Sequence, residues 1–519
     1  MFKKVLIANR GEIALRIIRT CKRLGIPSAA VYSEADRDAL HVKAADEAYP
    51  IGKSRVNESY LHIDRIIEAA KSAGADAIHP GYGLLSENSL FAERCRKEQI
   101  TFIGPPGDII AKMGSKIEAR KTMQKAKVPI VPGVSEPLPD VHSALAEARA
   151  IGFPVMLKAS AGGGGIGMQI VHSEEELAKA FEGNQKRAAS FFGDGAMYME
   201  KVIENARHIE IQILADSFGN TVHLFERDCS VQRRHQKVIE EAPSPFVDDE
   251  LRQRLGETAI KAAKSIGYQN AGTIEFLVDE KKQIYFLEMN TRLQVEHPVT
   301  EEITGLDLVE EQLKIAAGQA LPFSQKDINH RGHAIEVRIY AEDPVTFYPS
   351  PGTISSFSVL RHPSVRHECA VEKGSVISPF YDPMIAKMVV TANTRKQAIE
   401  QLKTALGEYH VEGIKTNIPL LTKIAHSEVF EKGEATTGFF TNNERGGVKM
   451  SVIKIQMAGN LWKIHVKPGD VIEEGQEVAI LESMKMEIPI IADAAGTVKE
   501  VKKSEGDFTD EGEVLIELQ

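Results

Sequence analysis

Residues 284–298 read Ile-Tyr-Phe-Leu-Glu-Met-Asn-Thr-Arg-Leu-Gln-Val-Glu-His-Pro, a strand-like run that continues into a run of polar residues. It follows another strand-like run, residues 272–276 (Gly-Thr-Ile-Glu-Phe), across a short polar segment. The two runs predict an antiparallel hairpin that brings Glu275 and Glu288 onto one face, within reach of a shared ion. A hairpin with both glutamates facing solvent is the alternative. The polar residues that end the quoted stretch argue against it, because so many hydrogen-bonding groups rarely accumulate without a ligand.

A glycine-rich segment lies earlier in the chain, between two further strand-like runs. It follows residues 155–158 (Val-Met-Leu-Lys) and contains Gly162-Gly-Gly-Gly-Ile-Gly167. Consecutive glycines let the backbone approach an anion closely and point its N–H groups at it. From this pattern alone, a flexible loop and a phosphate-binding lid fit equally well.

The first 110 or so residues alternate between strand-like and helix-like runs. Residues 4–8 and 28–32 predict strands, residues 13–24 predict a helix between them, and residues 77–79 predict a later strand. This order predicts a parallel, Rossmann-like sheet. No Gly-x-Gly-x-x-Gly motif follows the first strand, so the sequence argues against dinucleotide binding here.

The last 70 or so residues contain a pattern that repeats at a constant offset of 37 positions. Its members are glycines and aspartates: Gly459, Gly469-Asp470 and Gly475 recur as Gly496, Gly506-Asp507 and Gly512. Such a repeat predicts two similar β-layers related by a pseudo-twofold axis, each turning at its Gly-Asp pair. Lys485 lies between the two halves, where a hairpin tip would present it to solvent. A lysine at a loop tip is usually only a solvated charge, but this symmetric frame favours a specific role.

Composition sets broad limits on the class of protein. A chain of 519 residues with 43% apolar and 26% charged residues fits three or four soluble globular domains. The net charge of −10 argues against a general nucleic-acid binder. No apolar run is long enough to span a bilayer or to form a signal peptide, so no membrane contact is expected. The cysteines are scattered without a Cys-x-x-Cys pair, which predicts reduced thiols and a cytoplasmic location: Cys21, Cys95, Cys229 and Cys369.

Several long motifs, in order, resemble those of biotin carboxylase, a member of the ATP-grasp superfamily. They are residues 79–88 (His-Pro-Gly-Tyr-Gly-Leu-Leu-Ser-Glu-Asn), 233–237 (Arg-Arg-His-Gln-Lys) and 288–298 within the quoted stretch. Met484-Lys485-Met486 resembles the biotin-attachment tripeptide of carrier domains in biotin-dependent carboxylases, with Ser483 where alanine is more usual. Lipoyl domains share that fold but typically have Asp-Lys. The whole chain is therefore similar to a biotin carboxylase of the acetyl-CoA carboxylase type fused to a biotinyl carrier domain.

The resemblance implies an α/β and α+β ATP-grasp architecture followed by a small all-β, flattened barrel of the biotinyl/lipoyl type. The four implied domains are a Rossmann-like N-terminal domain at 1–114, an ATP-grasp domain at 115–330 with a lid at about 130–203, a mixed C-terminal domain at 331–446 and a carrier domain at 450–519. The junction at 441–449 is short and polar and leaves no room for a dedicated partner-binding domain. We therefore expect the carboxyltransferase to be a separate polypeptide.

The resemblance also assigns roles to individual residues. ATP binding is assigned to Lys116, Lys158, Gly163, Gly164, Gly165, Glu200, Lys201, Ile203, His208, Gln232 and His235. Metal binding (Mg²⁺ or Mn²⁺) is assigned to Glu275, Glu288 and Asn290, whose hard oxygen atoms suit these ions. Bicarbonate binding is assigned to Lys237, Arg292, Gln294 and Val295, biotin binding to Tyr82, Arg338 and Asp382, and biotin attachment to Lys485. The catalytic set is Glu296, Arg338, Lys237 and Arg292, with Glu296 as the general base.

The chemistry explains these residue types. Bicarbonate is a poor electrophile, so ATP first converts it to carboxyphosphate, and the spread negative charge of the phosphoryl group requires metal ions and cations. A solvated glutamate is too weak a base for this step, so we expect Glu296 in an enclosed environment. Bicarbonate and ATP are then the substrates, and the expected partners are a carboxyltransferase, a biotin protein ligase and a second copy of the chain, through Arg19 and Arg366. Acetyl-CoA is the first expectation for the final acceptor, and propionyl-CoA or methylcrotonyl-CoA fit equally.

Two other classes of function remain open at this point. One is a different ATP-grasp carboxylate-amine ligase with a lipoyl-like appendage, which Met484-Lys485-Met486 and Arg338 speak against. The other is a carrier or scaffold with an inactive ligase domain, which the full set of acidic and basic site residues speaks against. One departure from the family pattern is Ile166, which stands where many relatives carry arginine or lysine.

Overall fold

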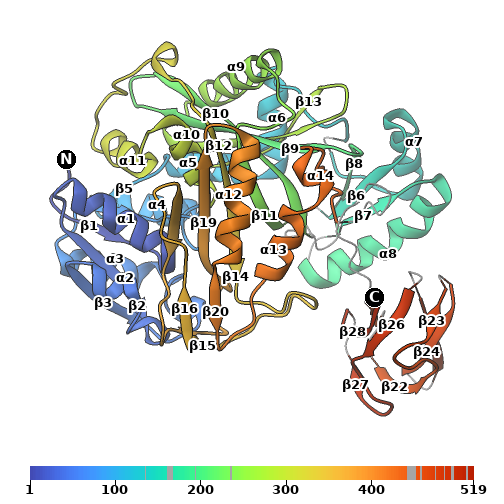
Figure 1. Cartoon of the computed structure of the whole chain (residues 1–519). Coiled ribbons are helices and arrows are strands. Elements are labelled where there is room, and N and C mark those ends of the chain that lie inside the picture. Colours follow the sequence, from blue (N-terminus) through green and yellow to red (C-terminus); the bar gives the residue numbers. More distant parts are fainter. Residues whose placement is uncertain are drawn as a thin grey trace. The chain divides into compact units, whose positions relative to one another are not determined.

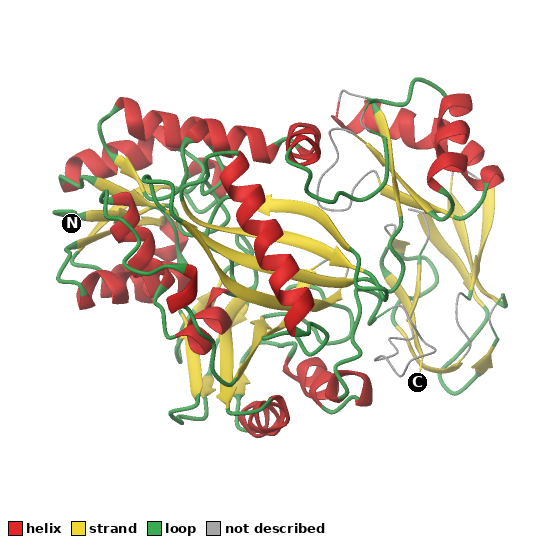
Figure 2. Cartoon of the chain, turned by 90° about the horizontal axis from the view of Figure 1, so that it is seen from above, coloured by secondary structure: helices red, strands yellow, loops and turns green. Residues whose placement is uncertain are grey.

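The computed structural model describes residues 1–134, 136–159, 168–192, 195–233, 236–440, 452–455, 459–473, 475–483, 486–492, 496–509 and 512–518. The chain divides into two compact units, the first comprising Met1–Glu342 and Pro349–Phe439 and the second Asp343–Tyr348 and Phe440–Gln519 (Figure 1). Helices lie over the strands of the larger unit (Figure 2). Within the described residues, no helix combines the length and apolar character that crossing a lipid bilayer requires.

A five-stranded parallel sheet forms the N-terminal part of the larger unit, in the order β3-β2-β1-β4-β5. Its strands are β1 (Val5–Ile7), β2 (Ser28–Ser33), β3 (Glu47–Gly52), β4 (Ala77–His79) and β5 (Thr101–Phe102), with helices α1 (Gly11–Arg23), α2 (Leu40–Ala44), α3 (Ile63–Ala73) and α4 (Ser89–Lys97). Val5 and Ile7 pack into one apolar cluster and Leu6 into another. Because a parallel sheet is covered on both faces, its central strand β1 is apolar throughout. The predicted Rossmann-like sheet is confirmed, and α1 starts two residues earlier than expected because Gly11, at φ +66°, makes the turn into it.

The centre of the larger unit is an eight-stranded antiparallel sheet in the order β13-β12-β9-β10-β11-β14-β19-β17. Its strands are β9 (Arg207–Ala215), β10 (Thr221–Arg233), β11 (Gln236–Ala242), β12 (Asn270–Val278), β13 (Ile284–Asn290), β14 (His333–Tyr340), β17 (Val365–Cys369) and β19 (Met384–Ala392). β12 and β13 form the predicted hairpin, with Glu275 opposite Glu288. β11 pairs with β14, so one continuous sheet crosses residue 330, where the sequence predicts a domain boundary.

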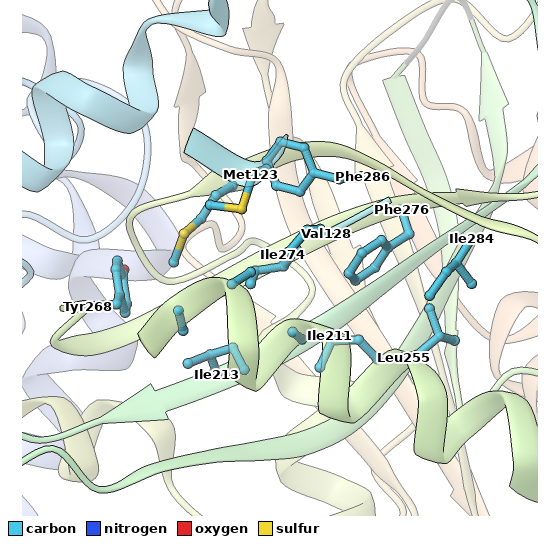
Figure 3. Packing of buried hydrophobic residues seen from close by; sticks show 14 of the residues in the cluster. Met123, Val128, Ile211, Ile213, Leu255, Tyr268, Ile274, Phe276, Ile284 and Phe286 are labelled. Atoms are coloured by element: carbon cyan, nitrogen blue, oxygen red, sulfur yellow. The ribbon is translucent and has the colours of Figure 1, made fainter. Parts of the chain in front are cut away.

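One face of this sheet carries the main apolar core. Ile209, Ile211 and Ile213 alternate along β9, and Ile274 and Phe276 alternate along β12 on the same side. Helix α9 (Asp249–Ser265) covers them with its buried apolar residues, as Figure 3 shows for the neighbourhood of Leu255. Since successive side chains on a strand point to opposite faces, the residues between these positions point away from the core. That opposite face carries the polar groups described below.

The lid region has a small sheet of its own, in the order β7-β6-β8. Its elements are β6 (Val155–Ala159), β7 (Met168–Val171), β8 (Met197–Lys201), α7 (Val141–Ile151) and α8 (Glu174–Phe192). The two strand-like runs around the glycines are thus a real antiparallel pair, β6 and β7. The glycine-rich stretch itself, with Gly163, Gly164, Gly165 and Ile166, lies outside the described residues.

The other elements of the larger unit connect and cover these sheets. The helices are α5 (Gly107–Gly114), α6 (Lys116–Lys125), α10 (His297–Thr304), α11 (Leu308–Ala316), α12 (Arg395–Gly407), α13 (Ile418–Ala425) and α14 (Glu428–Glu431), with short 3₁₀ turns η1 (Glu34–Asp36), η2 (Val56–Glu58) and η3 (Gln325–Asp327). Two small ribbons pair β15 (Gly352–Thr353) with β18 (Val376–Ile377) and β16 (Ser356–Ser358) with β20 (His410–Glu412). The four cysteines form no disulfide with one another.

The C-terminal region contains two four-stranded sheets, β21-β28-β26-β23 and β25-β24-β22-β27. Their strands are β21 (Val452–Lys454), β22 (Gly459–Ile464), β23 (Val471–Ile472), β24 (Glu477–Ser483), β25 (Met486–Ile491), β26 (Gly496–Val501), β27 (Phe508–Thr509) and β28 (Val514–Leu518). A shift of 37 residues carries β22 onto β26 and β23 onto β27. Each strand of the first repeat thus has its counterpart in the other sheet. The predicted pair of layers is confirmed, but each repeat contributes two strands to each sheet.

The predicted Gly-Asp turns follow the same symmetry in detail. Gly469 N–H donates to the Val498 carbonyl and Gly506 N–H donates to the Leu461 carbonyl, both at 2.7 Å. The two glycines have φ angles of +95° and +92°, which residues with a side chain adopt only with strain. The glycines are therefore required by the backbone of the turns.

Candidate active site

A row of charges crosses four neighbouring strands on the sheet face opposite the apolar core. Arg227 on β10 is the register partner of Glu210 on β9, and Glu210 pairs in turn with Glu275 on β12. Glu288 on β13 completes the row opposite Glu275. Arg227, Glu210 and Glu275 are buried, so these charges must satisfy one another or a ligand.

Lys237, near the start of β11, gathers three carboxylates around its ammonium group. Its Nζ donates to Glu210 Oε2 at 2.6 Å, to Glu275 Oε1 at 2.9 Å and to Glu296 Oε1 at 2.7 Å. Burial acts to lower the pKa of Lys237, but the three carboxylates outweigh it and raise that pKa well above its usual value. Lys237 is therefore a permanent cation.

Glu296 lies between two cations. Its Oε1 accepts from Lys237, and its Oε2 accepts from Arg338 Nη2 at 2.9 Å. Arg338, on β14, also donates from Nε to Glu240 Oε1 at 2.6 Å. The Glu296 side chain has no exposed surface, so the expected enclosure is present. Burial acts to raise the pKa of Glu296, but Lys237 and Arg338 outweigh it and hold that pKa well below its usual range.

Arg292, just after β13, contacts both its sequence neighbours and a residue from the N-terminal part of the chain. Its guanidinium donates to Glu87 Oε2 at 2.8 Å, to Asn290 Oδ1 at 2.8 Å and to Gln294 Oε1 at 3.0 Å. Asn290 and Gln294 in turn donate their amide N–H groups to Glu275 Oε1, at 2.9 and 2.8 Å. Of the predicted bicarbonate residues, Arg292 and Gln294 thus form one connected network with Lys237 around the Glu275 carboxylate.

The three predicted metal ligands fit a hard divalent cation. Glu275 is buried, Glu288 opens to solvent, and Asn290 is buried two residues further along β13. Desolvation by the surrounding protein and the nearby Glu275 charge raise the pKa of Glu288. Two ionised carboxylates, Glu275 and Glu288, therefore lie together at an electrostatic cost that a bound cation would relieve. His208, Glu210 and Glu275 also place one ligand atom each within 4.8 Å of one another. Among the described residues, oxygen donors dominate this corner, which suits Mg²⁺ or Mn²⁺.

The predicted nucleotide residues fall into two groups. In the lid region, Lys158 on β6 donates to the Glu200 carboxylate on β8, and Lys201 Nζ donates to the Gly152 and Phe153 carbonyls at 2.9 and 2.7 Å. Ile203, half-buried, follows β8. On the main sheet, His208 Nε2 lies 2.9 Å from Glu275 Oε2, its Nδ1 lies 2.6 Å from Gln232 Nε2, and exposed Lys116 starts α6. His235 lies outside the described residues.

The predicted biotin residues come from two distant parts of the sequence. Tyr82 has a buried hydroxyl that makes no hydrogen bond with the described residues, and its ring faces Lys387 Nζ at 5.6 Å from the ring centroid. Asp382 is exposed and accepts from the Met384 N–H at 2.9 Å. The predicted attachment residue, Lys485, lies outside the described residues, between strands β24 and β25 in the sequence. The last described pair of that hairpin is Ser483 with Met486.

Three carboxylates at the site escaped the sequence analysis as functional residues: Glu87, Glu210 and Glu240. Glu87 was visible only as part of a longer motif, and its contact with Arg292 joins segments more than 200 residues apart. Glu210 did carry a signal, because it sits between isoleucines in an alternating buried strand. Glu240 carried a weaker signal, because its neighbours on β11 are Ile239 and Glu241.

This combination of a three-stranded lid, an antiparallel sheet and a carboxylate–lysine–arginine cluster defines an ATP-dependent ligase of the ATP-grasp class. Families matched by the sequence sharpen the assignment. They are described as biotin carboxylase, N-terminal domain (residues 1–110), carbamoyl-phosphate synthase L chain, ATP binding domain (115–324), biotin carboxylase C-terminal domain (336–442) and biotin-requiring enzyme (451–518). The ranges lie close to the four predicted domains, whose exact boundaries stay predictions.

Individual relatives agree with the family matches. The chain is 73% identical over 439 residues to biotin carboxylase 2 of Bacillus subtilis, covering 85% of this chain and 99% of the relative. It is 54% identical to one component of the pyruvate carboxylase of Methanothermobacter thermautotrophicus, with 86% of this chain and 91% of the relative covered. It is 51% identical to the alpha chain of the rat methylcrotonoyl-CoA carboxylase, with 85% of this chain and 62% of the relative covered.

Two solved structures are also similar. The biotin carboxylase of Campylobacter jejuni has a TM-score of 0.81 at 51% identity, over 84% of this chain and 98% of that one. The biotin carboxylase domain dimer of the Hydrogenobacter thermophilus 2-oxoglutarate carboxylase, in complex with MgADP, ADP and bicarbonate, has a TM-score of 0.80 at 51% identity, over 84% and 97%.

The chain belongs to the biotin carboxylase family and carries a C-terminal domain of the biotin/lipoyl type. It is a ligase, the biotin carboxylase component of a biotin-dependent carboxylase. Its cofactors are ATP, Mg²⁺ and covalently bound biotin.

Proposed function

We propose that this protein carboxylates the biotin on its own C-terminal domain, by way of carboxyphosphate, for transfer to acetyl-CoA by a separate carboxyltransferase. The observation that carries the proposal is the buried Glu296 carboxylate, which lies within hydrogen-bonding distance of both Lys237 and Arg338. The proposed base, Glu296, thus directly contacts the proposed cation for bicarbonate, Lys237, and the proposed cation for the biotin ring, Arg338.

Each residue of this cluster has a distinct task in the proposal. Bicarbonate binds to Lys237, Arg292, the Gln294 side chain and the Val295 backbone, and Glu296 takes its proton as the oxygen attacks the γ-phosphate of ATP. Arg292 has five N–H donors, of which those toward Asn290 and Gln294 are held by neutral amides. A charged bicarbonate can compete for these donors, because charge-assisted hydrogen bonds are the stronger ones.

The metal and the nucleotide are proposed to bind next to this cluster, beside Glu275 and Glu288 on strands β12 and β13. Glu275, Glu288 and Asn290 would hold Mg²⁺ or Mn²⁺, which supplies charge neutralisation for the phosphates of ATP. Lys116 and Lys158 carry the positive charge on the protein side. Glu200, Lys201 and Ile203, with His208, Gln232 and His235, form the nucleotide pocket. The glycines of the lid contribute backbone N–H groups to the phosphates.

The proposed assembly has three further parts. Lys485 carries biotin in amide linkage, attached by a biotin protein ligase, and Tyr82, Arg338 and Asp382 bind the ring. A homodimer is proposed, in keeping with the dimer named for the Hydrogenobacter relative. In a single chain, Arg19 already pairs with Glu368, and Arg366 pairs with Glu301 at 2.8 Å. The cytoplasmic location stays a prediction.

The final acyl acceptor is the least constrained part of the proposal. Relatives named for methylcrotonoyl-CoA carboxylase and pyruvate carboxylase are 51% and 54% identical, so methylcrotonyl-CoA or pyruvate is the second candidate. Propionyl-CoA stays an alternative from the sequence analysis. Acceptor recognition belongs to the carboxyltransferase, which is a separate chain in this proposal. Purifying that partner with the intact protein and assaying a panel of acyl-CoA esters and pyruvate decides between them.

The half-reaction is tested by ATP hydrolysis with the purified full chain. Hydrolysis should require both bicarbonate and biotin, and Glu296→Gln should reduce it by orders of magnitude while ATP still binds. Activity that is independent of bicarbonate, or a Glu296→Gln variant with near-normal turnover, would contradict the proposal. Intact-mass analysis after co-expression with a biotin ligase should show one added biotin.

A further inference from the structure

Lys387 is a lysine with no exposed surface in the middle of β19, next to the proposed site. Its register partner on β14 is Arg338, the residue that contacts Glu296. A buried ammonium is costly unless it is paired, so its partners indicate what it is for. None of the roles proposed above involves it.

The Lys387 ammonium contacts three separate segments of the chain. Its Nζ donates to the Val295 carbonyl at 2.6 Å, lies 3.3 Å from Glu12 Oε1, and faces the Tyr82 ring. Glu12 is on α1, Tyr82 follows β4, and Val295 lies between β13 and α10. The three predicted domains of the carboxylase unit therefore meet at one side chain.

Glu12 and Lys387 depend on each other electrostatically. The Glu12 carboxylate is buried, and neither oxygen accepts a hydrogen bond from the described residues. Burial raises the pKa of Glu12, and the Lys387 charge is the largest influence acting against that rise. Lys387 thus completes a buried ion pair and still has an N–H for the Val295 carbonyl.

That carbonyl has a particular place in the site. It belongs to the planar peptide group that joins Val295 to Glu296, so holding it fixes the backbone on both sides. On one side is the Gln294-Val295 backbone that is proposed to bind bicarbonate. On the other side is the proposed base, whose side chain leaves the backbone directly after this peptide group.

We propose that Lys387 is a positioning residue that sets the Val295–Glu296 peptide so that bicarbonate and its base are aligned. The role rests on the proposed function of Val295 and Glu296. Lys387 touches no substrate in this arrangement. It acts through one charge-assisted hydrogen bond to the backbone, and Glu12 keeps its ammonium group in place.

The main test is the paired variant Lys387→Met/Glu12→Gln, which removes both charges and leaves no buried ion unpaired. Its KM for bicarbonate should rise about tenfold or more, with the KM for ATP within about twofold of wild type, the size expected for loss of one hydrogen bond to a charged group. The single variant Lys387→Met should lower the thermal midpoint further than the paired variant, because it strands the Glu12 carboxylate.

A matched control exists in the same unit. Arg252 on α9 donates to the buried Glu226 carboxylate at 2.9 Å and to the Val247 carbonyl at 3.1 Å, so it also joins a buried acid to a backbone oxygen. The paired variant Arg252→Met/Glu226→Gln should change the thermal midpoint and leave the KM for bicarbonate unchanged. An equal rise in that KM would show that loss of any such pair is sufficient, and would overturn the inference.

A second readout does not depend on turnover. Hydrogen–deuterium exchange of peptides covering residues 290–298 should be faster in Lys387→Met/Glu12→Gln than in wild type, and unchanged in the Arg252 control. Unchanged exchange together with an unchanged KM for bicarbonate would refute the positioning role. If wild type itself showed no bicarbonate-dependent hydrolysis, the proposed function would fail, and the exchange result alone would still decide whether Lys387 holds this backbone.

Discussion

Replacing Arg338 by lysine keeps a positive charge beside Glu296 and removes the forked guanidinium. In the native site Arg338 Nε lies 2.6 Å from Glu240 Oε1, and Nη2 lies 2.5 Å from the same oxygen and 2.9 Å from Glu296 Oε2. The guanidinium therefore bridges two buried carboxylates. Lysine carries its charge on one nitrogen atom at the end of a shorter side chain, so it can pair well with one of the two carboxylates and not with both.

The expected cost follows from the bond that is lost. A hydrogen bond between charged groups contributes about 1.5–3 kcal/mol, and each 1.36 kcal/mol changes a rate about tenfold. Glu296 keeps its contact with Lys237, whereas the printed partner of Glu240 is Arg338, so the ammonium should pair with Glu240 and the contact with Glu296 is the one at risk. Arg338→Lys should therefore lower kcat/KM for biotin roughly 10- to 150-fold, with the KM for ATP little changed.

The assay is bicarbonate-dependent ATP hydrolysis at varied concentrations of free biotin, and Arg395→Lys is the matched control. Arg395 forks onto buried Glu241, the residue next to Glu240, with contacts of 2.7 and 3.1 Å. It should lose stability to a similar degree without losing kcat/KM. An Arg338→Lys variant within about threefold of wild type, or a control that falls as far, would refute the bridging role of the guanidinium.

Three further outcomes are expected. Burial raises the pKa of Glu240 to about 7. The stability that the protonated Glu240 contributes is therefore fully present below the unfolded-state pKa of about 4.5 and is lost as the pH rises through about 7. In Glu240→Gln this pH-dependent loss should be smaller by about 3 kcal/mol, which thermal midpoints at about pH 5 and pH 8 measure. Lys485→Arg should abolish the mass increase of biotin attachment, and an increase that persists would place the biotin elsewhere. Gly469→Ala and Gly506→Ala should each cost about 1–3 kcal/mol and match each other, because both positions have φ above +90° and open space around an added Cβ. The chain's single tryptophan, Trp462 on β22, reports their effect by fluorescence in the intact protein, and unequal effects would contradict the pseudo-twofold relation.

The fold was predictable wherever the pattern is local. The β12–β13 hairpin follows from two alternating runs around a short turn, and the N-terminal sheet follows from buried apolar runs that alternate with helices. The pairing of β11 with β14 was not predictable in this way. It joins strands separated by about 90 residues, and nothing in either strand specifies its neighbour.

The repeat in the C-terminal region shows the same limit from another side. An offset of 37 residues identifies which strands are equivalent, and so it predicts two equivalent layers. Equivalence does not specify pairing, because β22 and β24 satisfy the repeat equally well in one layer with each other or in separate layers. In the structure they pair in one sheet, which β25 and β27 of the second repeat complete.

The residues of the site divide in the same way. Glu275 and Glu288 were accessible to sequence reasoning alone, because strand register places them opposite each other. The partners that define the charge of the site were not, since Glu210, Glu240 and Glu87 reach Lys237, Arg338 and Arg292 across distant segments. An acidic residue between apolar neighbours on a buried strand is the signal that would have identified Glu210.

The electrostatics of Glu296 pose a question for a general base. A carboxylate whose pKa lies well below its usual range is fully ionised, but it holds a proton poorly. Lys237 and Arg338 cause this, and Lys237 is also the proposed bicarbonate ligand. In the proposed complex the negative charge of bicarbonate lies beside Glu296 and shares the Lys237 ammonium, and both effects should raise the pKa of Glu296. Water at the same position carries no charge and leaves the pKa low. In this proposal the base gains strength only when bicarbonate is present, so hydrolysis of ATP by water should stay slow.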